Sequence, residues 1–145
     1  MLRIIKDTIE AVKANGYNVG LRVGNKWITE FTNDEVLPLF AFDPIEYDLD
    51  TANFQQENTL RFVVGYNIDE AEQSDILNIE TVEYCEEVWR QFLIKLTNYV
   101  DVNDTRPVQI TRLANIKQFH GSQFSLSLSG VVVTLYVNIY RANQC

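Results

Sequence analysis

The segment from Ile76 to Val100 constrains the fold more than any other part of the chain, because its pattern is that of one long amphipathic helix. Its apolar residues recur at steps of three and four, which places them on one helical face. Acidic residues fill its first turns and basic residues its last, which complements the helix dipole. Either Ser74 with Asp75 or Asn78 is expected to cap its start. The apolar face consists of Val82, Cys85, Trp89, Phe92, Leu93 and Leu96.

The rest of the chain predicts one shorter helix and a sheet. A helix over residues 2–14 is expected to end at Asn15-Gly16, because glycine readily adopts the left-handed conformation that stops a helix. Strands are predicted over 19–23, 27–31, 60–68, 108–116 and 124–140, with turns at Gly24-Asn25 and His120-Gly121-Ser122. Pro38 cannot donate to a ladder, so 36–42 is predicted to be an edge strand or an extended arm.

These elements predict an α+β fold in which the long helix (about 76–100) and the N-terminal helix pack on a mixed or antiparallel sheet of four or more strands. At 145 residues, the chain is expected to form a single domain, 1–145. The apolar positions of the last strand shift from even to odd across Ser129-Gly130, which indicates a β-bulge. That strand also exceeds what a small domain can cover, so part of it is expected to meet another chain. The predicted core is Phe62, Val64, Trp89, Phe92, Leu96, Val133 and Leu135.

Acidic residues gather in two segments that are predicted to be loops. The longer loop, about 43–57, has carboxylates on alternate residues, as calcium loops do, but it lacks the required glycine and closing glutamate. The second loop spans 69–72. We expect the acidic side chains to lie at a subunit interface or to face a lumen. They are Asp43, Glu46, Asp48, Asp50, Glu57, Asp69, Glu70 and Glu72.

The charge distribution narrows the possible partners. The net charge of −8 disfavours simple nucleic-acid binding, which needs basic residues to neutralise phosphates. Residues 1–100 hold 18 acids and 8 bases, whereas 101–145 hold 2 acids and 4 bases. This asymmetry either forms an ordinary solvated surface or lets copies of the chain associate head to tail.

No pattern of catalytic or metal-ligating residues stands out. The only histidine, His120, lies in a predicted turn with no cysteine or carboxylate beside it, and Cys85 lies on the buried face of the helix. We therefore expect no enzyme activity, no cofactor and no metal. The charged N-terminal residues are not those of a signal peptide, and no apolar segment is long enough to span a membrane.

The order of elements is helix, hairpin, acidic loop, strand, long helix and a final hairpin that ends in LSGVVVTLYV (128–137) with a polar tail. This organisation resembles the tail terminator proteins of long-tailed bacteriophages and similar head–tail joining, or neck, proteins. The resemblance implies a structural virion subunit, assembled in the host cytoplasm. Its copies would form a ring, commonly a hexamer, at the tail–neck junction. Its implied partners are the tail tube and neck proteins, and DNA would pass through an acidic lumen without specific binding.

The alternative comes from another class: an acidic immunity or inhibitor protein that blocks a basic toxin or nuclease through its carboxylates. Stoichiometry separates the two, because a ring protein associates with itself and an inhibitor binds its partner one to one.

Overall fold

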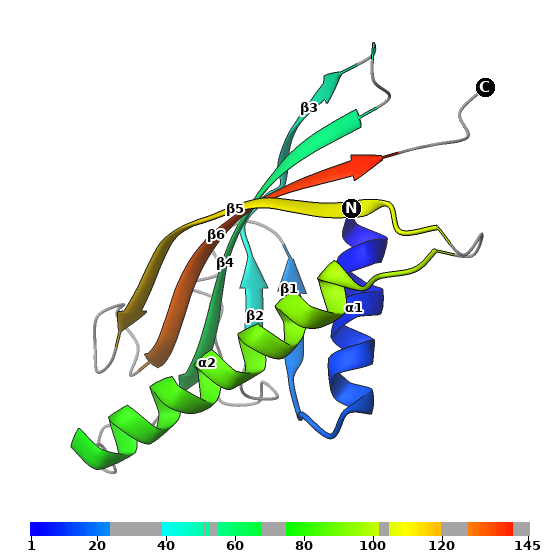
Figure 1. Ribbon diagram of the computed structural model, residues 1–145. Helices are drawn as coiled ribbons and strands as arrows, with labels where there is room; N and C mark the ends of the chain where they lie inside the picture. Colours follow the sequence, from blue (N-terminus) through cyan, green and yellow to red (C-terminus); the bar gives the residue numbers. More distant parts are fainter. Residues whose placement is uncertain are drawn as a thin grey trace.

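Two helices cover one face of a mixed six-stranded sheet, so the predicted α+β fold is confirmed (Figure 1). The computed structural model describes residues 1–23, 39–50, 52, 55–67, 75–101, 105–119 and 128–140. The predicted strand at 27–31, both predicted turns and the acidic segment 69–72 lie outside these ranges. The elements are α1 (Leu2–Ala14), β1 (Gly20–Val23), β2 (Leu39–Phe42), β3 (Glu46–Asp50), β4 (Gln55–Asn67), α2 (Asp75–Thr97), β5 (Val108–Phe119) and β6 (Leu128–Tyr140).

Both helices form where the apolar spacing predicts them. α1 buries Ile5, Ile9 and Val12 and is followed by Gly16 with φ of 93°, as expected of a left-handed stop. α2 ends at Thr97 rather than at Val100, because the side chains of Thr97 and Asn98 donate hydrogen bonds back to carbonyl groups of the last turn. Since the helix begins at Asp75, Asn78 lies inside it and is not its cap.

The sheet has the order β1-β2-β4-β6-β5, and β3 pairs with the end of β4 that β2 does not reach. Among the strand pairs that the structure describes, only β1–β2 is parallel. The expectation of an edge strand or extended arm at 36–42 was wrong for Leu39–Phe42, because β2 lies between β1 and β4. Pro38 precedes β2, so all four residues of the strand keep the N–H group that a ladder requires.

The core lies between the sheet and the helices. Phe40 and Phe42 of β2, Phe62 of β4 and Phe92 of α2 form an aromatic cluster with ring centroids 4.8–6.5 Å apart. All seven predicted core residues are buried, which confirms that part of the prediction. They follow one another at steps of two along the strands and at steps of three and four along α2, and together they make one continuous apolar layer.

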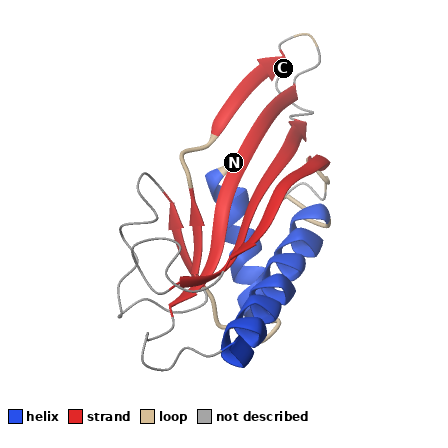
Figure 2. Ribbon diagram, turned by 90° about the vertical axis from the view of Figure 1, so that its left-hand side faces the viewer, coloured by secondary structure: helices blue, strands red, loops and turns tan. Residues whose placement is uncertain are grey.

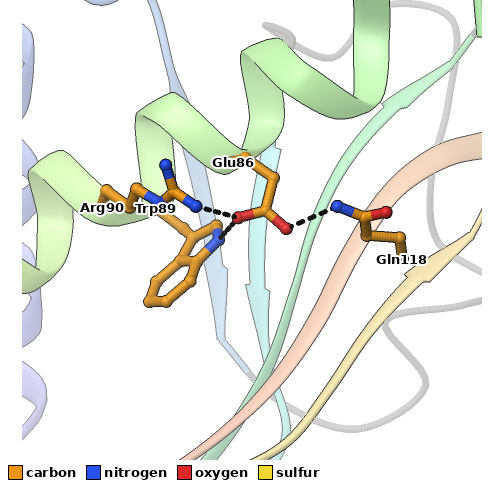
Figure 3. A network of polar contacts seen from close by, with 4 residues as sticks. All are labelled: Glu86, Trp89, Arg90 and Gln118. Carbon is orange, nitrogen blue, oxygen red and sulfur yellow. Dashed lines mark hydrogen bonds and ion pairs between the residues drawn. The ribbon is translucent and has the colours of Figure 1, made fainter. Parts of the chain in front are cut away.

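The side chain of Glu86 on α2 makes three polar contacts, one of which reaches the edge strand β5 (Figure 3). The carboxylate of Glu86 accepts hydrogen bonds from Trp89 Nε1 at 2.8 Å and Gln118 Nε2 at 2.9 Å, and its Oε2 lies 3.6 Å from Arg90. Only 14% of the Glu86 side chain is exposed. Its charge is therefore partly desolvated but shared among three donors.

The predicted long acidic loop at 43–57 is incorrect, because its described residues mostly form a β-hairpin. Glu46–Asp50 is strand β3, paired antiparallel with Gln55–Thr59 of β4. Asp50 Oδ1 accepts a hydrogen bond from Ala52 N at 3.1 Å, which begins the turn. Tyr47 and Leu49 alternate with three acids, so the segment has the period of a strand despite its charge.

The predicted bulge at Ser129-Gly130 is also wrong, because β6 pairs with β4 without interruption from Leu128 to Tyr140. The irregularities are in β5 instead, between Ile110 and Arg112 and between Ala114 and Lys117. Asn115, within the second, has φ of 54°. Gly130 is required by a close approach of strands: an added Cβ would lie 1.9 Å from the carbonyl oxygen of Val64.

Candidate assembly surfaces

One half of the sheet extends beyond the two helices (Figures 1 and 2). This projecting half consists of β3, the start of β4, the end of β6 and the start of β5, which lie side by side. The register places Glu46 opposite Thr59, Thr59 opposite Tyr136 and Tyr136 opposite Arg112. Glu46 and Arg112 thus lie at the same level on its two outer strands.

A hollow of about 610 Å³ lies on the sheet face that the helices leave uncovered, and we call it the trough. One wall carries Glu46, Asp48 and Glu57, of which Asp48 and Glu57 face each other across the β3–β4 ladder. The other wall carries Arg112, whose guanidinium carbon lies 5.6 Å from the ring centre of Tyr136. The lining is Glu46, Tyr47, Asp48, Glu57, Asn58, Thr59, Thr111, Arg112, Tyr136 and Asn138.

The carboxylates of the trough form no ion pair in the described part of the chain, although Arg112 lies on the opposite wall. No described ion pair or hydrogen bond involves the side chains of Glu46, Asp48 or Glu57. Like charges directly opposite each other in a ladder destabilise it by about 0.2–1 kcal/mol. The hairpin therefore keeps a small electrostatic penalty that a cationic neighbour would relieve.

The structure places the described residues of the predicted site at three separate locations. It brings Glu46, Asp48 and Glu57 together at the trough, whereas Asp50 lies at the hairpin turn. Asp43 lies at the junction of β2 and β3, where burial raises the pKa of its carboxyl, the nearby Arg61 opposes the rise and Glu46 adds to it. The predicted residues Asp69, Glu70 and Glu72 lie outside the described ranges.

Sequence reasoning missed Arg112 and Tyr136, the basic and aromatic part of the trough. The only signal was that Arg112 breaks the alternation of apolar residues along β5. The structure explains the break, because Thr111 is an extra residue in the β5–β6 register and moves Arg112 to the face opposite the helices.

A second hollow, of about 470 Å³, lies between the start of α1 and the β3 hairpin, and we call it the apolar groove. Four of its residues are large, apolar and exposed. Their exposed fractions are 57% for Leu2, 42% for Val23, 59% for Tyr47 and 64% for Leu49. Contiguous exposed apolar surface of this kind marks sites of interaction. Its other lining residues are Met1, Pro44, Ile45 and Gln56.

The described residues offer no metal centre and no activated cysteine. No group of three or more histidine, cysteine or acidic side chains within them is placed to hold a metal ion. Along β3, alternate carboxylates are about 7 Å apart, whereas calcium requires oxygens at about 2.3–2.6 Å. Burial raises the pKa of the Cys85 thiol to about 12, so the nucleophilic thiolate is scarce at neutral pH.

The notable surfaces of the described residues are thus the trough, the apolar groove and the free outer strands of the projecting half. No helix among these residues combines the length and the apolar character needed to cross a bilayer. Comparison with protein-family models and with curated proteins finds no match for this chain.

Proposed function

We propose that the protein is a structural subunit of a bacteriophage virion, a tail terminator or head–tail connector protein whose copies form a ring at the tail–neck junction. The observation that carries the proposal is the apolar groove. It exposes Leu2, Val23, Tyr47 and Leu49 where the sheet extends beyond its helices. Burying one leucine side chain stabilises a contact by about 1.5–3 kcal/mol, so this surface favours a permanent neighbour.

The order of elements supports the same proposal. A short helix, strands, a long helix and a final pair of long strands follow one another, as in the organisation that resembles tail terminator proteins. The large excess of acidic residues in the chain also suits a channel for DNA. Like charge opposes binding of phosphates, so DNA passes an acidic wall without adhering to it. The tail tube and the neck proteins are the proposed neighbours along the channel axis.

Mass measurement over a range of concentrations, with imaging of the particles, tests the assembly. We expect closed rings, most simply of six subunits, and detection of the protein in purified virions. The double variant Tyr47→Asp, Leu49→Asp should weaken assembly because it places charge in the apolar groove. The matched control is Ile79→Asp, Ile94→Asp, since these residues of α2 are exposed by 59% and 50% but lie outside the groove.

The carboxylates of the trough favour one alternative, an acidic inhibitor of a basic toxin or nuclease. Such a protein stays monomeric and forms a one-to-one complex. A strict monomer at millimolar concentration that is also absent from virions would refute the ring and favour the inhibitor.

A further inference from the structure

The two outer strands of the projecting half each have a free edge within the described structure. There, β3 pairs with β4 alone, and β5 pairs with β6 alone. A free edge presents unpaired backbone N–H and C=O groups that another strand can bind. The protomer thus offers two docking edges on opposite sides of one four-stranded unit.

The two edges carry opposite charge. Residues 39–50, which contain β3, include four acids and no base, whereas residues 105–119, which contain β5, include three bases and no acid. The register shows that the charges also coincide in position. Arg112 lies level with Glu46, and Arg106 precedes Pro107, whose carbonyl accepts a hydrogen bond from Tyr140 at the level of Asp50.

This arrangement disfavours symmetric contacts. Two β3 edges would oppose acid to acid, and two β5 edges would oppose base to base, and like charges placed close together across a contact repel each other. The attractive combination is therefore β3 of one copy with β5 of another.

We propose that the acidic edge of β3 binds the basic edge of β5 in the next copy of this chain, head to tail, so that the projecting halves form a continuous sheet around a ring. This inference rests on the proposed function, because it identifies the contact that closes the ring. A heterologous contact closes into a ring when its rotation allows, and a symmetric contact would stop at a dimer. Exposed Tyr47 and Leu49 add apolar area beside the charges.

Charge exchange tests the contact. The acid-edge variant is Glu46→Lys, Asp48→Lys, which changes the net charge from −8 to −4, and the base-edge variant is Arg106→Glu, Arg112→Glu, which changes it to −12. The controls have the same net charges but alter exposed residues elsewhere. They are Glu80→Lys, Glu83→Lys on α2, and Lys6→Glu, Lys13→Glu on α1.

We expect each edge variant alone to associate at least about tenfold more weakly than its control, because each would oppose like charges at the contact. Mixing the two edge variants should restore assembly, since β3 of either variant then meets a β5 of opposite charge. Circular dichroism and thermal melting verify that all variants fold.

The outcomes separate the inference from the proposed function. If the wild-type protein assembles and the edge variants assemble as strongly as their controls, the ring stands and this contact is wrong. If the mixture of edge variants fails to assemble although each variant is folded, the head-to-tail pairing is refuted. If the wild-type protein is a monomer at millimolar concentration, both proposals are refuted.

Discussion

Replacing Gly130 with alanine should be among the most damaging single changes in the protein. Gly130 lies opposite Gly65 in the β4–β6 ladder, two pairs before the ladder ends at Asn67 and Leu128. A Cβ at residue 130 would lie 1.9 Å from the carbonyl oxygen of Val64 and 2.9 Å from Gly65 Cα. Ordinary van der Waals contact begins at 3.4 Å, so the strands would have to separate locally by about 1.5 Å.

That separation exceeds what the ladder tolerates. Hydrogen bonds of about 2.9 Å would stretch beyond 4 Å and be lost. Two lost ladder bonds contribute about 0.5–1.5 kcal/mol each, and the buried groups left without partners add about 1–3 kcal/mol. We therefore expect Gly130→Ala to lower the free energy of unfolding by about 2–6 kcal/mol, and Tm by about 4–24 °C for a chain of this size.

Urea denaturation followed by tryptophan fluorescence measures the effect. The control is Gly16→Ala, where no atom lies within 4 Å of the added Cβ but φ is 93°. Its cost should be about 1–2 kcal/mol, the strain of a left-handed residue alone. A Gly130→Ala protein that loses less than the Gly16→Ala protein would refute the close-approach explanation.

Three further predictions concern the helices. Glu86→Ala should lower the free energy of unfolding by about 2–3 kcal/mol because it leaves Trp89 Nε1 and Gln118 without their acceptor, and Glu83→Ala, at an exposed position of the same helix, should change it little in the same denaturation assay. The pKa values of Tyr17 and Tyr99 should exceed 10.0, that of Tyr17 through its hydrogen bond to Glu87 and that of Tyr99 through burial and then its hydrogen bond to Asp7. The contribution of these two tyrosines to the stability of the fold should be complete below pH 10 and should be lost as pH rises through their folded-state pKa values. Absorbance titration of tyrosinate should lose its highest-pH component in the Tyr17→Phe and Tyr99→Phe variants. Titration curves equal to that of the wild-type protein would contradict this. In a Cys145→Ser protein, the remaining thiol, Cys85, should react with a thiol reagent only as fast as the protein opens, and a rate equal to that of a free thiol would contradict its burial.

Periodicity predicted the helices and the core because both depend on local spacing. Trp89, Phe92 and Leu96 lie on one face of α2 whatever the rest of the chain does. Strand β3 was missed because three acids in five residues concealed the alternation of Tyr47 and Leu49. Pairing with β4 identifies β3 as a strand, because four of its five residues are exposed and three are acidic.

The interior position of β2 and the register of β5 were not predictable, because they depend on partners distant in sequence. Pro38 indicated an edge, but only the pairing of β2 with both β1 and β4 decides which strand is interior. Likewise, the trough needed the one-residue shift at Thr111, which brings Arg112 to the same face as Glu46 and Glu57. Such juxtapositions arise from tertiary register and have no local sequence pattern.

The central position of β6 has a consequence for how the chain folds during synthesis. β6 is the last described strand, yet it lies between β4 and β5, and its partners in β4 are 61 to 85 residues earlier in the chain. Pairing over such separations is slow, because the entropy of closing the intervening segment is lost before the ladder forms. A nascent chain that has emerged from the ribosome only as far as β5 contains both helices. It cannot connect β4 to β5, because β6, which lies between them, has not yet been made. The pairing of β1, β2, β3 and β4 can precede β6, but the sheet cannot be completed before β6 is available, and until then the edge of β4 that β6 covers stays unpaired.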